Sequence, residues 1–258
     1  MPFETHPSLI TPLDDTIIWR YMDFARFIQL LETQTLWFAR ADQFEDLLEG
    51  TYTDAELADL RSLVDPPGHP GRSIADIHVS GTRLARATTY VNCWRTGAAE
   101  SLAMWDLYGK GSGIVAIKSS IRLLKDALNK QPISVNIAQV RYIDWTTAPW
   151  DNNSLVMCAR KDSSYEHEAE VRAIIWEVAS SNHAPLANIT DGMKRWNDRT
   201  ANDPPFGITV PIDISKTIKE VIVGPREHAW VAELVGRIIN RYGLSIPVIP
   251  SDRLRPRL

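Results

Sequence analysis

The stretch that decides the fold is YEHEAEVRAIIW, residues 165–176. Charged residues fill its first half, and its second half is mainly apolar. Apolar side chains recur at every second position, which is the period of a β-strand with a buried face. We therefore expect residues 168–177 to form a central strand that carries Glu168, Glu170 and Arg172 on one face. The opposite face is uniformly apolar and must pack on the core.

Strands and helices are mixed along the rest of the chain without a regular alternation, which disfavours a doubly wound parallel sheet. We expect an α+β fold with a mixed, mainly antiparallel sheet flanked by helices, in a single domain over residues 1–258. The expected strands lie at residues 16–22, 35–40, up to 94, 113–118, 135–143, 207–213, 218–223 and 246–249. The expected helices follow Asp23 and lie at residues 54–63, 73–86, 101–108, 121–129 and 226–242. The expected loops are residues 66–71 and 178–206.

One stretch of this pattern suits a unit with parallel strands joined by a helix. It consists of the helix at residues 226–242 and the strand that follows at 246–249. Gly243 follows that helix at the position where a glycine commonly ends one.

Composition limits the class of protein. With 258 residues, of which 44% are hydrophobic, the chain can bury a core without disulfides or metals. The net charge of −4 gives no general electrostatic signature of nucleic-acid binding. The sequence has no secretory pattern and no apolar run of membrane-spanning length, so we expect a cytoplasmic protein with no membrane partner. Cys93 and Cys158 are expected to be reduced core thiols, although one disulfide is possible in principle.

The two carboxylates of the central stretch form the first candidate site. On one strand face, Glu168 and Glu170 would lie ~7 Å apart, from a rise of roughly 3.3 Å per residue. Their repulsion would raise one pKa, and Arg172 would lower the pKa of its neighbour. Acid–base pairs are set up in this way, but a structural arginine is satisfied in the same way. Both interpretations stay open.

Aromatic and basic residues form a candidate cofactor-binding set. Trp94, Trp105 and Tyr108 can form a wall for a planar ligand, or they can be core aromatics beside a flexible turn. Arg20 and Tyr21 lie in the first expected strand, where neighbouring side chains point to opposite faces. We therefore expect at most one of these two residues to line a shared site.

Residues 44–50 form an acidic segment, FEDLLEG, directly after an expected strand. Its carboxylates, Asp46 and Glu49 among them, can hold a divalent cation, cap a helix or pair with arginine. No close pairs of Cys or His with zinc-ligand spacing occur in the sequence.

Taken together and in this order, the motifs resemble a bacterial family catalogued as a domain of unknown function, number twenty-nine seventy-one in that series. The resemblance covers nearly the whole chain, and its most specific part is the charged motif at residues 165–172. The chain departs from the family pattern at Glu45, where the family has Asn, and at Leu47-Leu48, where it has Pro-Phe. The resemblance implies a family and no particular reaction. The matching segments are Trp19-Arg20-Tyr21, residues 36–39, residues 44–49, Cys93-Trp94, residues 104–108, residues 165–172, Val223-Gly224-Pro225 and Tyr242-Gly243-Leu244.

The leading functional hypothesis is an ADP-ribosyltransferase-like enzyme, or an NAD glycohydrolase, with NAD as its substrate. Such a transferase needs a basic residue on an early strand, an aromatic wall and a later glutamate that stabilises an oxocarbenium-like transition state. Arg20 is the candidate basic group, Trp105 or Tyr108 the wall and Glu170 the acid. The ligand would be a nucleotide, and no macromolecular target is indicated.

Two other classes of function stay open. One is a magnesium-dependent nuclease or phosphoesterase. Its metal ligands would be Asp46, Glu49, Glu168 and Glu170, with Lys161 nearby. The other is a non-catalytic sensor or interaction domain built around a buried ionic network. That network would comprise Glu168, Glu170, Arg20 and Arg172.

Overall fold

The strands and helices are assigned from a computed structural model, which describes residues 3–63, 73–109, 113–132, 134–148, 153–176 and 205–254. The strands are β1 (Ile17–Met22), β2 (Thr35–Arg40), β3 (Thr89–Thr96), β4 (Val115–Ser120), β5 (Asn136–Gln139), β6 (Arg141–Ile143), β7 (Arg160–Asp162), β8 (Glu170–Trp176), β9 (Gly207–Pro211), β10 (Glu220–Val223) and β11 (Val248–Pro250). The α-helices are α1 (Phe24–Thr33), α2 (Asp54–Ser62), α3 (Ile74–Ala87), α4 (Leu102–Tyr108), α5 (Ile121–Leu128), α6 (Ser154–Met157), α9 (Ile214–Thr217) and α10 (Ala229–Arg241). Two 3₁₀ helices are η1 (Ala41–Gln43) and η2 (Ser163–Glu168).

Nine of the described strands belong to one sheet. Seven of them lie in the order β11-β10-β4-β1-β3-β2-β9, while β8 pairs with β3 and β5. Every pair in this sheet is antiparallel except β10 with β11. This topology confirms the expected α+β fold with a mixed, mainly antiparallel sheet, and it confirms the parallel unit formed through α10. A separate parallel pair, β6 with β7, lies outside the main sheet.

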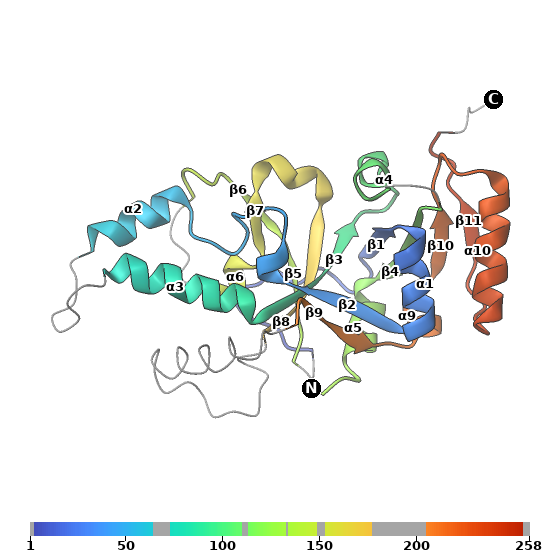
Figure 1. Cartoon of the computed structure of the whole chain (residues 1–258), viewed down its shortest axis with the longest axis horizontal. Helices are drawn as coiled ribbons and strands as arrows, with labels where there is room; N and C mark the ends of the chain where they lie inside the picture. Colours follow the sequence, from blue (N-terminus) through green and yellow to red (C-terminus); the bar gives the residue numbers. More distant parts are fainter. Residues whose placement is uncertain are drawn as a thin grey trace.

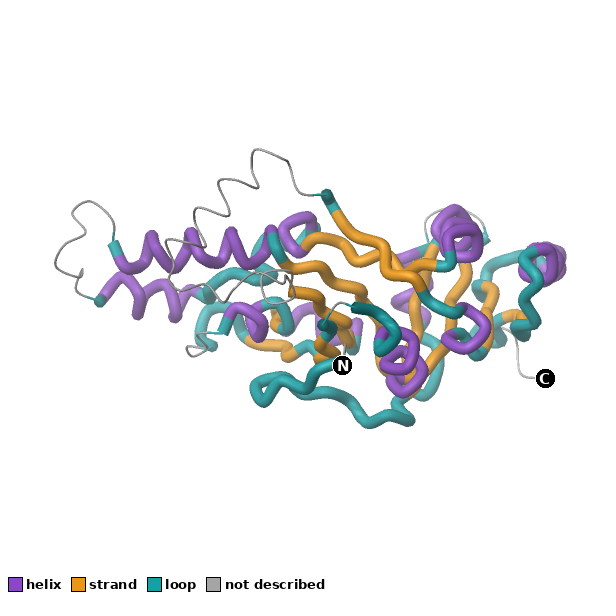
Figure 2. Tube along the Cα trace, turned by 90° about the horizontal axis from the view of Figure 1, so that it is seen from below, coloured by secondary structure: helices purple, strands orange, loops and turns teal. Residues whose placement is uncertain are grey.

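Helices lie at both ends of the molecule, beyond the sheet. Helices α2 and α3 project together at one end of the molecule, and α10 covers β11 at the other (Figure 1). The view turned by 90° shows the strands as a twisted layer through the middle of the molecule (Figure 2). No helix among the described residues is long and apolar enough to cross a membrane.

Helix α1 shows how local signals set an element in place. Asp23 caps its first turn by accepting a hydrogen bond from the Arg26 amide at 2.8 Å. Apolar residues at helical spacing, including Phe27 and Leu31, then turn inward onto the main core. Gln34 ends the helix in the left-handed region, with φ of 51°. The chain can therefore reverse directly into β2.

The main sheet opens between β1 and β3. Strand β1 pairs with β4 along its whole length, from Ile17 to Met22. With β3 it pairs only at its start, through Ile18 and Trp19. Beyond Trp19 the two strands are no longer paired, and β3 pairs with β2 instead. This opening leaves room for a cavity between the two strands.

Three sequence expectations need correction. The central strand begins at Glu170 and not at residue 168, because Ala169 takes a left-handed conformation with φ of 43°. Glu168 therefore belongs to η2 and does not reach its position by strand alternation. The single strand expected at residues 135–143 is two strands, β5 and β6, which belong to different sheets. Strand β7 and helices α6 and α9 were not anticipated from the sequence.

The remaining expected elements, loops and cysteines compare with the structure as follows. The other expected strands and helices occur, most with bounds shifted by up to three residues. The loop expected at residues 66–71 lies outside the described residues, as does most of the segment expected at 178–206. Cys93 on β3 and Cys158 after α6 are free thiols. Cys158 is buried, as expected of a core thiol, whereas Cys93 is only partly buried.

Candidate functional site

A cavity of about 470 Å³ lies where β1 and β3 separate. This volume is in the range of small-molecule and cofactor sites. Its wall combines residues of β1, α1, β2, β3, α4 and the corner between η2 and β8. The lining residues are Trp19, Arg20, Tyr21, Met22, Arg26, Gln29, Leu30, Thr35, Trp37, Ala39, Phe44, Val91, Cys93, Trp94, Arg95, Met104, Tyr108, Glu168 and Glu170.

Arg20 is the cation on the β1 wall. Its guanidinium is half-buried and donates one long hydrogen bond, 3.4 Å, to the carbonyl of Trp37 on β2. In the part of the chain that the structure describes, Arg20 forms no ion pair. Burial lowers its pKa to about 10, and the neighbouring Arg26 acts in the same direction. An anion bound in the cavity would satisfy this guanidinium.

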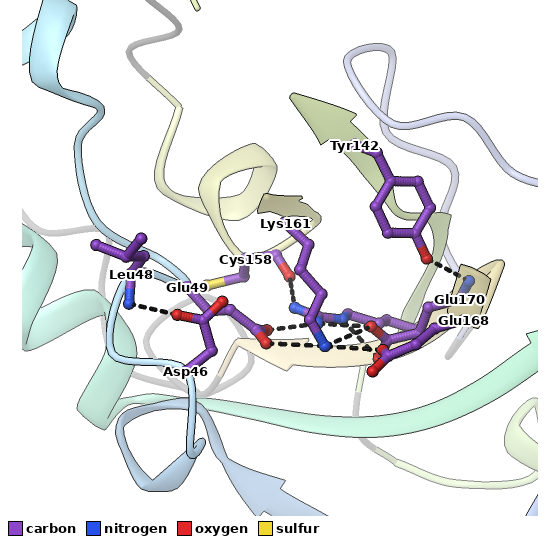
Figure 3. A network of polar contacts seen from close by, with 9 residues as sticks. Asp46, Leu48, Glu49, Tyr142, Cys158, Lys161, Glu168 and Glu170 are labelled. Atoms are coloured by element: carbon purple, nitrogen blue, oxygen red, sulfur yellow. Dashed lines mark hydrogen bonds and ion pairs between the residues drawn. The ribbon is translucent and has the colours of Figure 1, made fainter. Parts of the chain in front are cut away.

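Glu168 and Glu170 form the acidic wall of the cavity. Both carboxylates are buried, and both approach the ammonium of Lys161, at 2.8 Å and 3.9 Å respectively. Figure 3 shows Glu168, Glu170 and Lys161 converging with Glu49 in one polar network. The cavity therefore has walls of opposite charge.

Arg172 and Glu49 complete this network behind the cavity wall. Nη2 of Arg172 lies 2.7 Å from Oε2 of Glu170 and 2.5 Å from Oε2 of Glu49. Nη1 donates to the carbonyl of Cys158 at 2.8 Å. All five charged residues of the network are at most 7% exposed. Because every ion has a close partner of opposite charge, the burial of these charges is tolerated.

The corner between η2 and β8 places the two glutamates next to each other. Asp162 begins η2 by accepting a hydrogen bond from the Ser164 amide. Ala169 then reverses the chain direction locally, and its carbonyl accepts bonds from the amide and hydroxyl of Thr96 on β3. The glutamates on either side of this corner consequently reach the same ammonium although they belong to different elements.

The network keeps Glu170 ionised. Burial alone would raise the pKa of this carboxyl, but the charge and hydrogen bonds of Arg172, with Lys161 and the Cys93 thiol, lower it below the ordinary value. Burial and the adjacent Glu170 raise the pKa of the Cys93 thiol well above its usual range. Cys93 is therefore a protonated hydrogen-bond donor to Glu170 and not a thiolate nucleophile.

The structure brings together six of the eight residues expected at the catalytic and cofactor-binding positions. Arg20 and Tyr21 both line the cavity, which corrects the expectation that at most one would, because the cavity lies in the opening of the sheet. The two expected residues that do not line it are Trp105 and Arg172. The other four that do are Trp94, Tyr108, Glu168 and Glu170.

Trp105 and Arg172 do not line the cavity but contact residues that do. Trp105 packs edge-on against Tyr21, with ring centroids 4.8 Å apart, and its indole N–H donates to Glu100. Arg172 contacts Glu170 from the network side. Trp37, Phe44 and Cys93 line the cavity but were not among the expected site residues. Their positions depend on long-range pairing, and only their place in short aromatic motifs hinted at them.

The alternative metal ligands do not assemble around one point. Asp46 accepts a hydrogen bond from the Leu48 amide, and Glu49 pairs with Arg172 and Lys161. The ammonium of Lys161 occupies the space between Glu49, Glu168 and Glu170. Over the described ranges, no group of three or more His, Cys, Asp or Glu residues could hold a metal ion.

Fold and cavity together define an α+β protein with a ligand-sized cavity whose walls carry opposite charges. No family model matches the chain, so the resemblance to the bacterial family of unknown function stays a prediction. No curated protein matches it either. Among solved structures, a complex of Thermus sp. 2.9 DarT with ADP-ribosylated ssDNA matches with a TM-score of 0.40 and 12% sequence identity, over 94% of this chain and 97% of that one. A structural match of this degree carries no argument about function, which must therefore be inferred from the residues of the site.

Proposed function

We propose that this protein cleaves the nicotinamide–ribose bond of NAD and transfers ADP-ribose to an acceptor hydroxyl or amine, or to water. One observation carries the proposal: the guanidinium of Arg20, which forms no ion pair within the described residues, and the ionised carboxylate of Glu170 line the same cavity. NAD carries negative charge on its pyrophosphate and positive charge on its nicotinamide ring. A cavity with one basic and one acidic wall complements both ends of such a ligand.

The reaction requires little of the protein beyond electrostatics. When the bond between C1′ of ribose and the nicotinamide nitrogen breaks, the electron pair leaves with nicotinamide and positive charge develops on the ribose. The Glu170 carboxylate can stabilise this charge, and it can also hold a ribose hydroxyl. The acceptor oxygen or nitrogen then bonds to C1′ and releases its proton to solvent. A carboxylate that stays ionised at neutral pH suits this role.

The charge of the network supports oxidised NAD as the ligand. Three carboxylates face two cations, which leaves one excess negative charge beside the cavity. A cationic nicotinamide ring gains from this charge, whereas the neutral dihydronicotinamide of NADH does not. Trp37 and Tyr108 line the cavity and are partly exposed, so their rings are available for stacking against planar groups of the ligand.

The test measures NAD binding by calorimetry and nicotinamide release by chromatography, both in the presence of a chelator. We expect the wild type to bind NAD, Arg20→Gln to bind it more weakly, and Glu170→Gln to lose nicotinamide release. Glu220→Gln is the matched control, because Glu220 pairs with Lys118 and does not line the cavity. The proposal fails if the wild type releases no nicotinamide from NAD, whether or not it binds NAD.

A second candidate function has an observation in its favour. The network of Glu49, Lys161, Glu168, Glu170 and Arg172 is fully partnered, as a purely structural network would be. Arg20 is not part of it, which departs from the network expected from the sequence. A non-catalytic domain would show a sharply lower melting temperature in Glu170→Gln and no NAD binding in the wild type. Metal-dependent chemistry would instead show Mg²⁺ or Mn²⁺ binding that is lost in Asp46→Asn.

A further inference from the structure

We propose that Lys161 is a positioning residue of this site, which holds Glu168 and Glu170 in place on the cavity wall without contacting the ligand itself. This inference rests on the proposed function. Lys161 does not line the cavity, but its ammonium contacts Glu168 at 2.8 Å, Glu49 at 3.2 Å and Glu170 at 3.9 Å. It therefore links both wall carboxylates to the acidic segment that follows β2.

The small β6–β7 sheet presents Lys161 to the corner between η2 and β8. Tyr142 and Lys161 are direct partners in this parallel pair, and both side chains reach the same corner. The Tyr142 hydroxyl accepts a hydrogen bond from the Glu170 amide at 2.7 Å, while Lys161 holds the carboxylates. Figure 3 shows Tyr142 and Lys161 approaching Glu168 and Glu170. One two-stranded platform thus holds the backbone of Glu170 and places a cation beside its side chain.

The neighbouring Arg160 anchors this platform on its other side. Its guanidinium is buried and pairs with Glu56 of α2, with Nη1 2.8 Å from Oε1. It also donates to the carbonyl of Thr51 at 3.2 Å. Successive residues of a strand point in opposite directions, so Arg160 secures β7 to α2 while Lys161 points to the cavity wall. The position of Lys161 is therefore set from outside the cavity.

A lysine that stays protonated is poorly suited to act as a base or nucleophile. Burial would lower its pKa, but Glu170, Glu49 and Glu168 outweigh burial and raise the pKa above its ordinary value. The ring of Tyr165 lies 4.4 Å from the ammonium and adds a favourable contact. Lys161 consequently acts as a fixed cation. Among the described residues, the other titratable groups that face Lys161 or Glu170 from the surrounding elements are Glu49, Cys93, Tyr108, Tyr142, Tyr165, Glu168 and Arg172.

The test compares Lys161→Met and Lys161→Gln with the wild type in the full chain. The first readout is the titration of the Glu170 carboxyl, followed by carbon NMR. Without the ammonium the Glu170 carboxyl loses a stabilising cation, so we expect it to titrate at higher pH in both variants. The second readout is kcat/KM for nicotinamide release against pH. We expect its acid limb to move to higher pH and its plateau to fall on the order of tenfold to a hundredfold, because the reacting groups are displaced.

Two further variants make the test specific. Lys125→Gln is the matched control, because Lys125 also pairs with a carboxylate, Asp14, and lies over an aromatic ring, that of Phe3. We expect it to leave the Glu170 titration and kcat/KM unchanged. Lys161→Arg keeps the cation and should restore the acid limb toward its wild-type position, which a loss of packing alone would not explain.

The inference is overturned if the Glu170 carboxyl titrates at the same pH in Lys161→Gln as in the wild type. If the wild type releases no nicotinamide, the proposed function fails, while the NMR titration still decides whether Lys161 holds Glu170. Lys161→Gln keeps a hydrogen-bond donor toward Glu168. It therefore provides the comparison should Lys161→Met fail to fold.

Discussion

The guanidinium of Arg172 holds both carboxylate oxygens of Glu170, with Nε 2.9 Å from Oε1 and Nη2 2.7 Å from Oε2. The two residues lie two positions apart on β8, so their side chains share one face of the strand. This two-point contact orients the carboxylate that faces the cavity. Arg172 itself is only 1% exposed, so its charge depends entirely on protein partners.

Replacing Arg172 should therefore destabilise the fold strongly. Arg172→Met leaves Glu170 and Glu49 buried with one cation fewer, and we expect unfolding to become easier by about 3–5 kcal/mol. Urea denaturation measures the loss. Arg226→Met is the control, since Arg226 pairs with Asp106 on the surface and should lose no measurable stability. Equal losses in the two variants would contradict the structural role of Arg172.

The stability contributed by Glu170 should depend on pH in one direction. The pKa of this carboxyl is lowered below its ordinary value of 4.5 in the folded protein. Its contribution is therefore complete above about pH 4.5 and is lost as the pH falls through the lower, folded-state pKa. We expect the difference in unfolding free energy between the wild type and Glu170→Gln to shrink in acid. A difference that stays constant from neutral to strongly acidic pH would argue against the lowered pKa.

Arg20 should matter for ligand binding and not for stability. Its pKa is lowered to about 10, mainly by burial, so its charge is less stable in the folded protein than in water. We expect Arg20→Gln to keep or slightly raise the melting temperature while NAD affinity falls about 10- to 100-fold, the usual effect of losing a charged hydrogen bond. Calorimetric measurement of the melting temperature and of NAD affinity checks both expectations. A large fall in melting temperature would instead assign Arg20 to the core.

Gly207 should be intolerant of a side chain, because β9 packs closely on β2. A Cβ atom there would lie 2.3 Å from the Trp37 ring and 2.6 Å from the Phe38 carbonyl oxygen. We expect Gly207→Ala to cost about 1–3 kcal/mol of stability and to weaken NAD binding, since Trp37 lines the cavity.

Gly81 provides the comparison for this substitution. It lies in α3 with no atom within 4 Å of an added Cβ. Gly81→Ala should stabilise the fold by about 0.5–1 kcal/mol, because alanine loses less backbone entropy in a helix. Denaturation curves of both variants are needed, and a Gly207→Ala protein as stable as the wild type would contradict the close approach of β9.

Local sequence signals were sufficient for most of the elements. Asp23 before a run of apolar residues at helical spacing predicts α1, and alternation predicts most of β8. The helix that ends before Gly243 and the strand after it predicted the parallel unit at the edge of the sheet. These features depend on neighbours within a few residues, so a pattern in the sequence can reveal them. The pairing of Glu170 with Arg172 belongs to this group, because one strand carries both residues.

The tertiary structure alone decided how the cavity is assembled. Glu49 meets Arg172 across 123 positions of sequence, and no local period records such a contact. The early end of β1–β3 pairing places Arg20 and Tyr21 together in one cavity, although strand alternation predicts opposite faces. The left-handed conformation of Ala169 likewise keeps Glu168 out of β8. Lys161 reaches the site through the β6–β7 pair. Which strands pair, and where that pairing stops, depends on packing between distant segments. This is why the sequence pointed to the charged residues of the site but not to their arrangement.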